Sequence, residues 1–177
     1  VCSHLLPASS ILSHVNESTP PRWLTADQKH TWIAVAAMMV WLPASLDEQL
    51  QKEADISLPE YTVLSWLSMQ PGRCARMSDI AALANVQLSH LSRIATRLGQ
   101  RGWMTREPDP RDGRGTLARL TDTGWAKVVA TAPGHAEEVQ RLIFDSLSAD
   151  QATALRTAAE QIVATARPGL SLPSPED

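Results

Sequence analysis

The stretch LSHLSRIATRLGQRGWMTREPDPRDGRGTLARLTDTG, residues 88–124, decides the fold. Its first part, residues 88–101, has apolar side chains at helical spacing, and Gly102 follows as a natural end for that helix. The stripe expected to face a core consists of Leu91, Ile94, Ala95 and Leu98. The face expected to be exposed carries Ser89, His90, Ser92, Arg93, Thr96 and Arg97. The segment is therefore predicted to be an amphipathic helix with a polar, cationic outer face.

The second part of the stretch has the pattern of a β-hairpin. Between its two strands, the loop PDPRDGRG (residues 108–115) is expected to hold Arg111 and Arg114 at its tip. A short helix, MSDIAALA, and a three-residue turn precede the amphipathic helix. Two helices joined by a tight turn and followed by a two-stranded arm form a winged helix-turn-helix, which contacts a DNA duplex with its second helix and its wing. The expected strands are residues 104–107 and 116–120.

Charge is unevenly distributed along the chain. Residues 73–119 contain nine arginines and four acidic residues, a net charge of +5, whereas the rest contains seven basic and fifteen acidic residues, a net charge of −8. Arginine is the side chain best suited to phosphate groups. The pattern favours an anionic partner, double-stranded DNA, for the middle of the chain.

Two helices are predicted before the helix-turn-helix. TADQ (residues 25–28) has the capping-box spacing and begins a long helix that stays in phase through Leu50. Pro43 lies inside it, and we expect a bend there rather than a break. SLPE (residues 57–60) caps the next helix, which should end near Met69.

Two more helices are predicted after the wing. Residues 122–147 carry an apolar stripe, and Pro133 with the following glycine predicts a kink or break in it. SADQ (residues 148–151) caps a last helix, which continues to about Ala166. These stripes and that of the first helix exceed what a winged helix can cover, so a second chain is a plausible cover. The predicted fold class is mainly α with a small β wing.

The motifs in residues 88–124 are similar to those of one known family. A serine-rich helix start is followed in order by Arg-Leu-x-x-Arg-Gly, Asp-Pro-x-Asp-x-Arg and Leu-Thr-x-x-Gly. The stretch resembles the multiple-antibiotic-resistance regulator (MarR) family of winged-helix transcription factors, and the resemblance extends more weakly over residues 24–166. It implies a homodimer in which the first helix and the last two helices of both chains interlock, leaving two winged helices to read a pseudo-palindrome.

The resemblance also assigns site residues by position. Asp112 and Arg114 match the family's wing motif, whose arginine enters the minor groove; Asp112 is expected to orient the wing by pairing with a nearby arginine. The chain departs from the family at His90, where threonine is common, and at Gly99, where a helix former is usual. The positions that match the recognition-helix surface are Ser89, His90, Ser92, Arg93 and Arg97.

The same resemblance implies how the regulator is controlled. Trp32, Met39 and Trp66 could line a cleft that in this family commonly holds a small aromatic or phenolic effector, which would release a repressor from its operator. Two alternatives stay open. Cys74, with Arg73 and Arg76 nearby, could sense oxidants, because cationic neighbours lower a thiol pKa. The chain could also be a ligand-independent architectural DNA binder.

Other function classes find no support in the sequence. No apolar run is long enough to span a membrane, and no signal peptide is recognised, so we expect a cytoplasmic protein. No ligand spacing typical of a structural metal site and no catalytic motif are present, so we expect no metal, no cofactor and no enzyme activity. The expected organisation is a flexible extension (1–22), an N-terminal dimerisation helix (23–56), the winged helix-turn-helix (57–121), C-terminal dimerisation helices (122–167) and a flexible tail (168–177).

Overall fold

The computed structural model describes residues 21–169, so most of the predicted extension and tail lies outside the described residues. The chain divides into two units, residues 1–38 and 39–177, and the division falls inside the first helix, α1 (Ala26–Ala54). In the first unit, the predicted capping box is present: Thr25 Oγ1 accepts from the Gln28 backbone N–H at 3.2 Å, and the Thr25 N–H donates to the Gln28 side chain at 2.9 Å. As predicted, α1 is continuous through Pro43.

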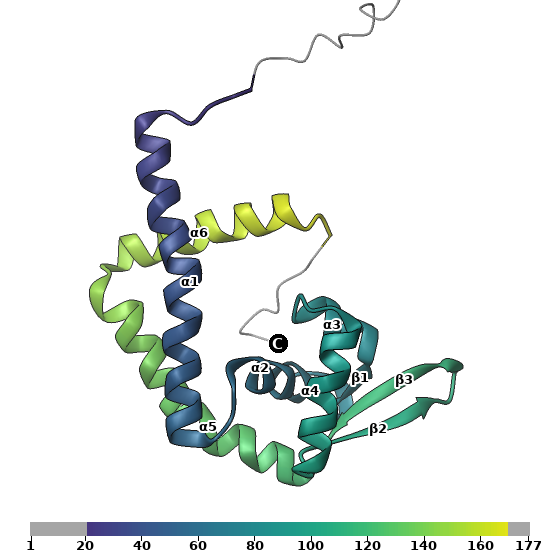
Figure 1. The fold of residues 1–177 in the computed structure, drawn as a ribbon. Helices are drawn as coiled ribbons and strands as arrows, with labels where there is room; N and C mark the ends of the chain where they lie inside the picture. Colours follow the sequence, from purple (N-terminus) through teal and green to yellow (C-terminus); the bar gives the residue numbers. More distant parts are fainter. Residues whose placement is uncertain (1–20, 170–177) are drawn as a thin grey trace, which may run out of the picture. The chain divides into compact units, whose positions relative to one another are not determined.

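The second unit holds the winged helix. Helix α2 (Leu58–Ser68) is followed by the short 3-10 turn η1 (Pro71–Arg73), strand β1 (Cys74–Arg76), α3 (Met77–Leu83) and α4 (Leu88–Gln100). Strands β2 (Met104–Asp109) and β3 (Asp112–Leu120) form an arm that projects beside α3 and α4 (Figure 1). The antiparallel sheet has the order β1-β3-β2, with β3 in the centre.

The sheet differs from the prediction in two ways. Strand β1 was not predicted, and it pairs Cys74 with Arg119 on β3. The wing strands are longer than predicted, because pairing continues to Pro108 opposite Thr116 and to Asp109 opposite Asp112. Pro108 is compatible with β2 because β2 is an edge strand, where a missing N–H costs no ladder bond. The turn at the wing tip is therefore only Pro110 and Arg111, and the predicted eight-residue loop is wrong.

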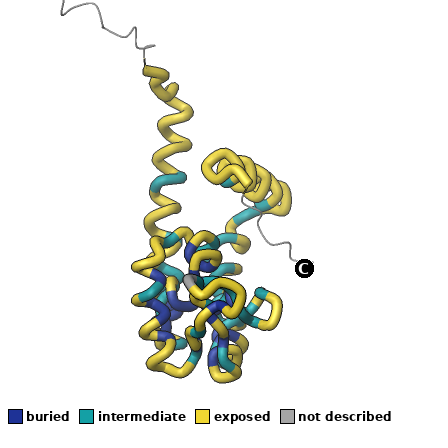
Figure 2. Tube along the Cα trace, turned by 90° about the vertical axis from the view of Figure 1, so that its right-hand side faces the viewer, coloured by how far each residue is buried: buried dark blue, intermediate teal, exposed yellow. Residues whose placement is uncertain are grey.

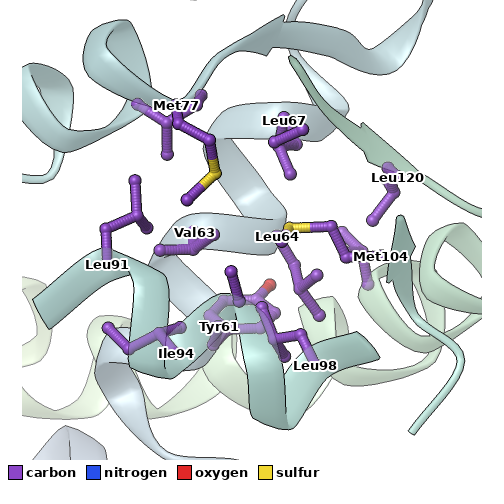
Figure 3. Close-up of a cluster of buried hydrophobic side chains, with 14 of the residues drawn as sticks. Tyr61, Val63, Leu64, Leu67, Met77, Leu91, Ile94, Leu98, Met104 and Leu120 are labelled. Carbon is purple, nitrogen blue, oxygen red and sulfur yellow. The ribbon is translucent and has the colours of Figure 1, made fainter. Parts of the chain in front are cut away.

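The core of the second unit lies where α2, α3, α4 and the sheet meet (Figure 3). The stripe predicted on α4 is buried, as is Ile80 on α3. Met104 and Leu120 anchor the base of the wing in the same core. Most of the buried residues lie in the winged helix (Figure 2). The packed core therefore holds α4 in place and leaves its outer face exposed. The buried α4 residues are Leu91, Ile94, Ala95 and Leu98.

The C-terminal helices follow the wing. Helix α5 (Asp122–Leu142) is capped by Thr121, whose side chain accepts from the Gly124 N–H. It continues through Pro133, so the helix does not break there, although it ends at Leu142, before the predicted residue 147. After the 3-10 turn η2 (Phe144–Ser146), α6 (Ala149–Ala166) begins with the predicted capping box and buries none of its residues. The predicted fold class, mainly α with one small sheet, is confirmed.

Within residues 21–169, no helix combines the length and the hydrophobicity that a bilayer crossing requires.

Candidate nucleic-acid interface

The exposed face of α4 presents most of the predicted recognition residues. Ser89, His90 and Arg93 are exposed in the first half of the helix, and Ser92 is half-buried. Arg93 makes no ion pair with any residue between 21 and 169. The first turns of α4 therefore offer hydroxyl groups, an imidazole and an uncompensated guanidinium to a partner.

Arg97, one turn further on, is held by an acidic residue. Its Nε lies 2.7 Å from Oε1 of Glu60, and about half of its side chain (52 %) stays exposed. Burial acts to raise the pKa of Glu60, but hydrogen bonds from Arg97 and Ser57, together with the charge of Arg97, hold that pKa below its usual value. The sequence predicts only a role in the cap of α2 for Glu60. Its pairing with a residue 37 positions away was not predicted.

Acidic side chains also fix the wing. Asp112 lies 3.7 Å from Arg76 Nη1, so it does pair with an arginine as predicted. The stronger contact belongs to Asp109, which is 4 % exposed; it accepts from Arg76 Nε at 2.7 Å and from the Arg111 backbone N–H at 2.9 Å. The N–H of Arg111 above all, and then the guanidinium of Arg76, hold the pKa of Asp109 below its usual value, although burial opposes them. Asp109 was not predicted as a site residue.

The wing tip points its cationic residue outward. Arg111 is exposed and, within the described part of the chain, carries no ion pair on its side chain. Arg114 lies on β3 close to the tip. Because Asp109 and Arg76 connect the tip to β1 and the start of α3, the wing has a defined direction relative to α4.

A groove of about 410 Å³ separates the start of α4 from the wing. Ser92 borders it from α4, and Arg106 borders it from β2. Arg106 donates to Thr96 at 3.5 Å and has no carboxylate partner among residues 21–169, so it is a further candidate contact for DNA. The other lining residues are Arg76, Met77, Ser78, Leu88, Asp112, Gly115 and Thr116.

The structure gives the positions and exposure of the three residues expected to bind an effector. Trp32 and Met39 are exposed on α1. Trp66 is partly buried and packs against the core of the winged helix. An effector site formed by these residues stays a prediction.

The surroundings of Cys74 differ from the oxidant-sensor expectation. Cys74 is a half-buried free thiol on β1. The guanidinium of Arg73 lies 4.2 Å from the centre of the Trp125 ring and pairs with Asp122 at 3.5 Å. Arg76 is bound to Asp109. Both arginines expected to activate the thiol are therefore engaged with other groups.

Comparison with known proteins connects this surface to a family. The MarR family model matches residues 56–116, which extend from the start of α2 almost to the end of the wing. The crystal structure of Sco3205, a MarR family transcriptional regulator from Streptomyces coelicolor in complex with DNA, is 36% identical and superposes with a TM-score of 0.80. The match covers 84% of this chain and 93% of Sco3205. The chain belongs to the MarR family.

Other relatives agree with this assignment. AbsC, a second MarR family regulator from Streptomyces coelicolor, is 31% identical with a TM-score of 0.77, over 83% of this chain and 99% of AbsC. The HTH-type transcriptional repressor IacR of Pseudomonas putida is 31% identical over 97 residues, which are 55% of this chain and about half (54%) of IacR. MarR family members are transcriptional regulators and not enzymes, which confirms that expectation for this chain.

Proposed function

We propose that this MarR-family regulator binds double-stranded DNA sequence-specifically as a homodimer, acting as a repressor that a small effector releases. The observation that carries the proposal is the combination of an exposed polar face on α4 with a wing whose direction is fixed by Asp109 and Arg76. Because DNA is the proposed target, we place the protein in the cytoplasm.

The pattern of ion pairs divides the arginines into those with a structural partner and those that are candidates for DNA contact. In the block from residue 73 to residue 119, carboxylates of the described residues neutralise five arginines. Arg93 on α4, Arg106 on β2 and Arg111 at the wing tip are exposed and form no ion pair with a carboxylate of residues 21–169. We assign Arg93 to base edges or phosphates of the major groove, Arg106 to phosphates, and Arg111 with Arg114 to the minor groove.

Uncovered apolar surface supports the homodimer. Helix α6 buries none of its residues, and Ile162 is 62% exposed. On α1, Val40 and Trp41 are also exposed. A second copy of the chain would remove this surface from water, which is the usual reason for such exposed helices.

The repressor role and the effector are the finer parts of the proposal. The IacR relative is named as a repressor, and repression requires only that the protein occupy DNA. An effector bound near Trp32, Met39 and Trp66 would release the operator if it bound better to a dimer whose winged helices no longer match the half-site spacing. A small phenolic compound is the effector class that we would test first.

The proposal is tested by selecting DNA with the protein itself. Binding sites are enriched from a random-sequence duplex library, and affinity for the selected duplex is compared with that for an unrelated duplex of equal length by fluorescence anisotropy. We expect Arg93→Ala and Arg114→Ala each to weaken binding of the selected duplex by about 1–3 kcal/mol while the dimer stays intact. Arg141→Ala, an exposed arginine on α5 that pairs with Glu138, is the control for loss of one positive charge. Equal affinity of the unaltered protein for both duplexes would refute sequence-specific binding.

A further inference from the structure

Two arginines, Arg97 on α4 and Arg101 at its C-cap, contact the turn between α1 and α2. Arg97 Nε donates to Glu60 Oε1 at 2.7 Å, and Arg101 Nη2 lies 2.8 Å from Asp55 Oδ2. Arg101 also donates to the backbone carbonyl of Asp55. The arginines are four positions apart, so they lie on the same face of the helix. Both ends of the turn are therefore tied to the helix that carries the proposed DNA contacts.

Glu60 uses its two carboxylate oxygens for two different tasks. Oε2 accepts from the backbone N–H of Ser57 at 3.1 Å and from its hydroxyl at 2.9 Å, which completes the capping box of α2. Oε1 binds Arg97. Glu60 is only 7% exposed, and a carboxylate at such a position is stable only when its charge and its lone pairs are satisfied. These partners thus fix the place of Oε1, and Oε1 fixes Arg97 Nε.

Arg97 keeps hydrogen-bonding capacity after this contact. Among residues 21–169, only its Nε has a hydrogen-bond acceptor, and half of the side chain is exposed. Its two Nη groups therefore remain available to a phosphate or a base edge. A guanidinium that is held at Nε loses less conformational freedom on binding DNA than a free one, which improves affinity for a correctly placed acceptor.

The turn itself is well anchored. Asp55 adopts a left-handed conformation (φ 47°) directly after α1, and the Ile56 N–H donates to the Leu50 carbonyl at 3.4 Å. Leu50 and Ile56 are buried in the core. Asp55 and Glu60 thus belong to a fixed part of the lobe, against which Arg97 and Arg101 are positioned.

We propose that Glu60 is a positioning residue for DNA recognition, which aims Arg97 at the duplex and connects the α1–α2 turn to the recognition helix. This inference rests on the proposed function. Glu60 would then contribute to the preference for one DNA sequence over another without contacting the DNA itself. The two arginine contacts also give the end of α1 a direct path to α4.

The test separates the two tasks of Glu60 with three variants. Glu60→Ala removes both the cap and the pair. Glu60→Gln leaves one neutral carbonyl oxygen, which can accept either from Ser57 or from Arg97 but not from both. Ser57→Ala removes the hydroxyl contact of the cap while leaving Glu60 to bind Arg97. Each variant is titrated with the duplex selected by the unaltered protein and with the unrelated duplex, well below its unfolding midpoint. We expect Glu60→Ala to lose about tenfold in preference for the selected duplex, Glu60→Gln to lose less, and Ser57→Ala to lose stability but no preference.

A double variant shows whether Glu60 acts through Arg97. In an Arg97→Gln background, Glu60→Ala should cause no further loss of preference, because the residue that it positions is absent. The inference would be overturned if the losses of preference in the two single variants multiplied in the double variant, or if Glu60→Ala left the preference unchanged. So would a loss of preference in Ser57→Ala as large as that in Glu60→Ala, since the effect would then come from the cap. A lack of preference in the unaltered protein would instead refute the proposed function.

Discussion

Gly124 in the first turn of α5 tests the packing that joins the wing to the C-terminal helix. A Cβ at this position would overlap the carbonyl oxygen of Trp103 and lie 2.9 Å from the Trp103 carbonyl carbon and 2.8 Å from Leu120 Cδ1. The Trp103 carbonyl is pinned, because it accepts from the Thr121 N–H at 3.1 Å. Overpacking typically costs about 1–3 kcal/mol, and a fixed backbone atom places this site at or above the upper end. Alanine regains about 1 kcal/mol of helix propensity, so Gly124→Ala should destabilise the fold by about 2 kcal/mol.

Gly134 in the same helix provides a matched control. A Cβ there would lie 2.9 Å from Glu53 Oε2 and 3.3 Å from Gln49 Nε2, which are the ends of flexible side chains. The gain in helix propensity should offset this contact, so Gly134→Ala should change stability little. For a chain of this size we expect the thermal midpoint to fall by about 4–8 °C in Gly124→Ala, measured by circular dichroism. Equal midpoints in the two variants would refute the packing described here.

Three further predictions concern the wing, a half-buried histidine and the thiol. Asp109→Asn should weaken the contacts with Arg76 and the wing tip, and therefore reduce preference for the selected duplex in anisotropy titrations. An unchanged preference would show that the Asp109 contacts do not set the direction of the wing. Burial lowers the pKa of His135 below its ordinary value of 6.5, so the fold favours the neutral ring and should lose stability as the pH falls from about 6.5 through the folded-state pKa. In His135→Gln, the free energy of unfolding measured with urea should therefore depend less on pH between about pH 7 and about pH 5 than in the unaltered protein. An identical pH dependence in both proteins would exclude His135 as its source. Because its arginine neighbours are engaged elsewhere, Cys74 should not control binding: peroxide should leave the DNA affinity of the protein and of Cys74→Ser equally unchanged, and release that Cys74→Ser abolishes would support the oxidant sensor.

The helices could be predicted because their signals are local. Capping boxes fixed where α1, α2 and α6 begin, and apolar spacing identified the buried face of α4. At Pro43 the first helix continues as predicted. Pro133 shows the limit of this reasoning, because a kink and a break were both possible there. A proline removes one hydrogen bond, and whether the helix continues depends on packing along its whole length, which a local rule does not include.

The sheet was harder to predict because pairing partners are distant in sequence. Strand β1 has three residues and no alternating pattern of its own, and it exists because β3 offers an edge. Pro108 and the glycines of the wing were interpreted as a loop, although Pro108 lies on the edge strand β2, which tolerates it, and the glycines lie on β3. Local composition therefore gave the position of the wing but not its length.

The exposed face of α4 was predicted correctly, whereas the ion pairs that support the candidate site were not predicted. Outward positions on α4 follow from helical periodicity, so Ser89, His90 and Arg93 could be assigned from the sequence alone. The ion pairs of Arg97 with Glu60 and of Arg76 with Asp109 could not be predicted, because tertiary contacts decide which carboxylate meets which arginine. A cap residue that is also acidic, and an aspartate that precedes proline in a wing motif, were the available signals.

The most direct test of the account is methylation footprinting on the selected duplex, because dimethyl sulfate reports on guanine N7 in the major groove and on adenine N3 in the minor groove. If α4 occupies the major groove and the wing the minor groove, guanine N7 protection should disappear in Arg93→Ala, and adenine N3 protection should disappear in Arg111→Ala and Arg114→Ala. The protected guanines of a dimer should lie in two patches on one side of the duplex, about one helical turn or a multiple of it apart. Full protection at both positions in all three variants would contradict the proposal that this helix and this wing read the DNA.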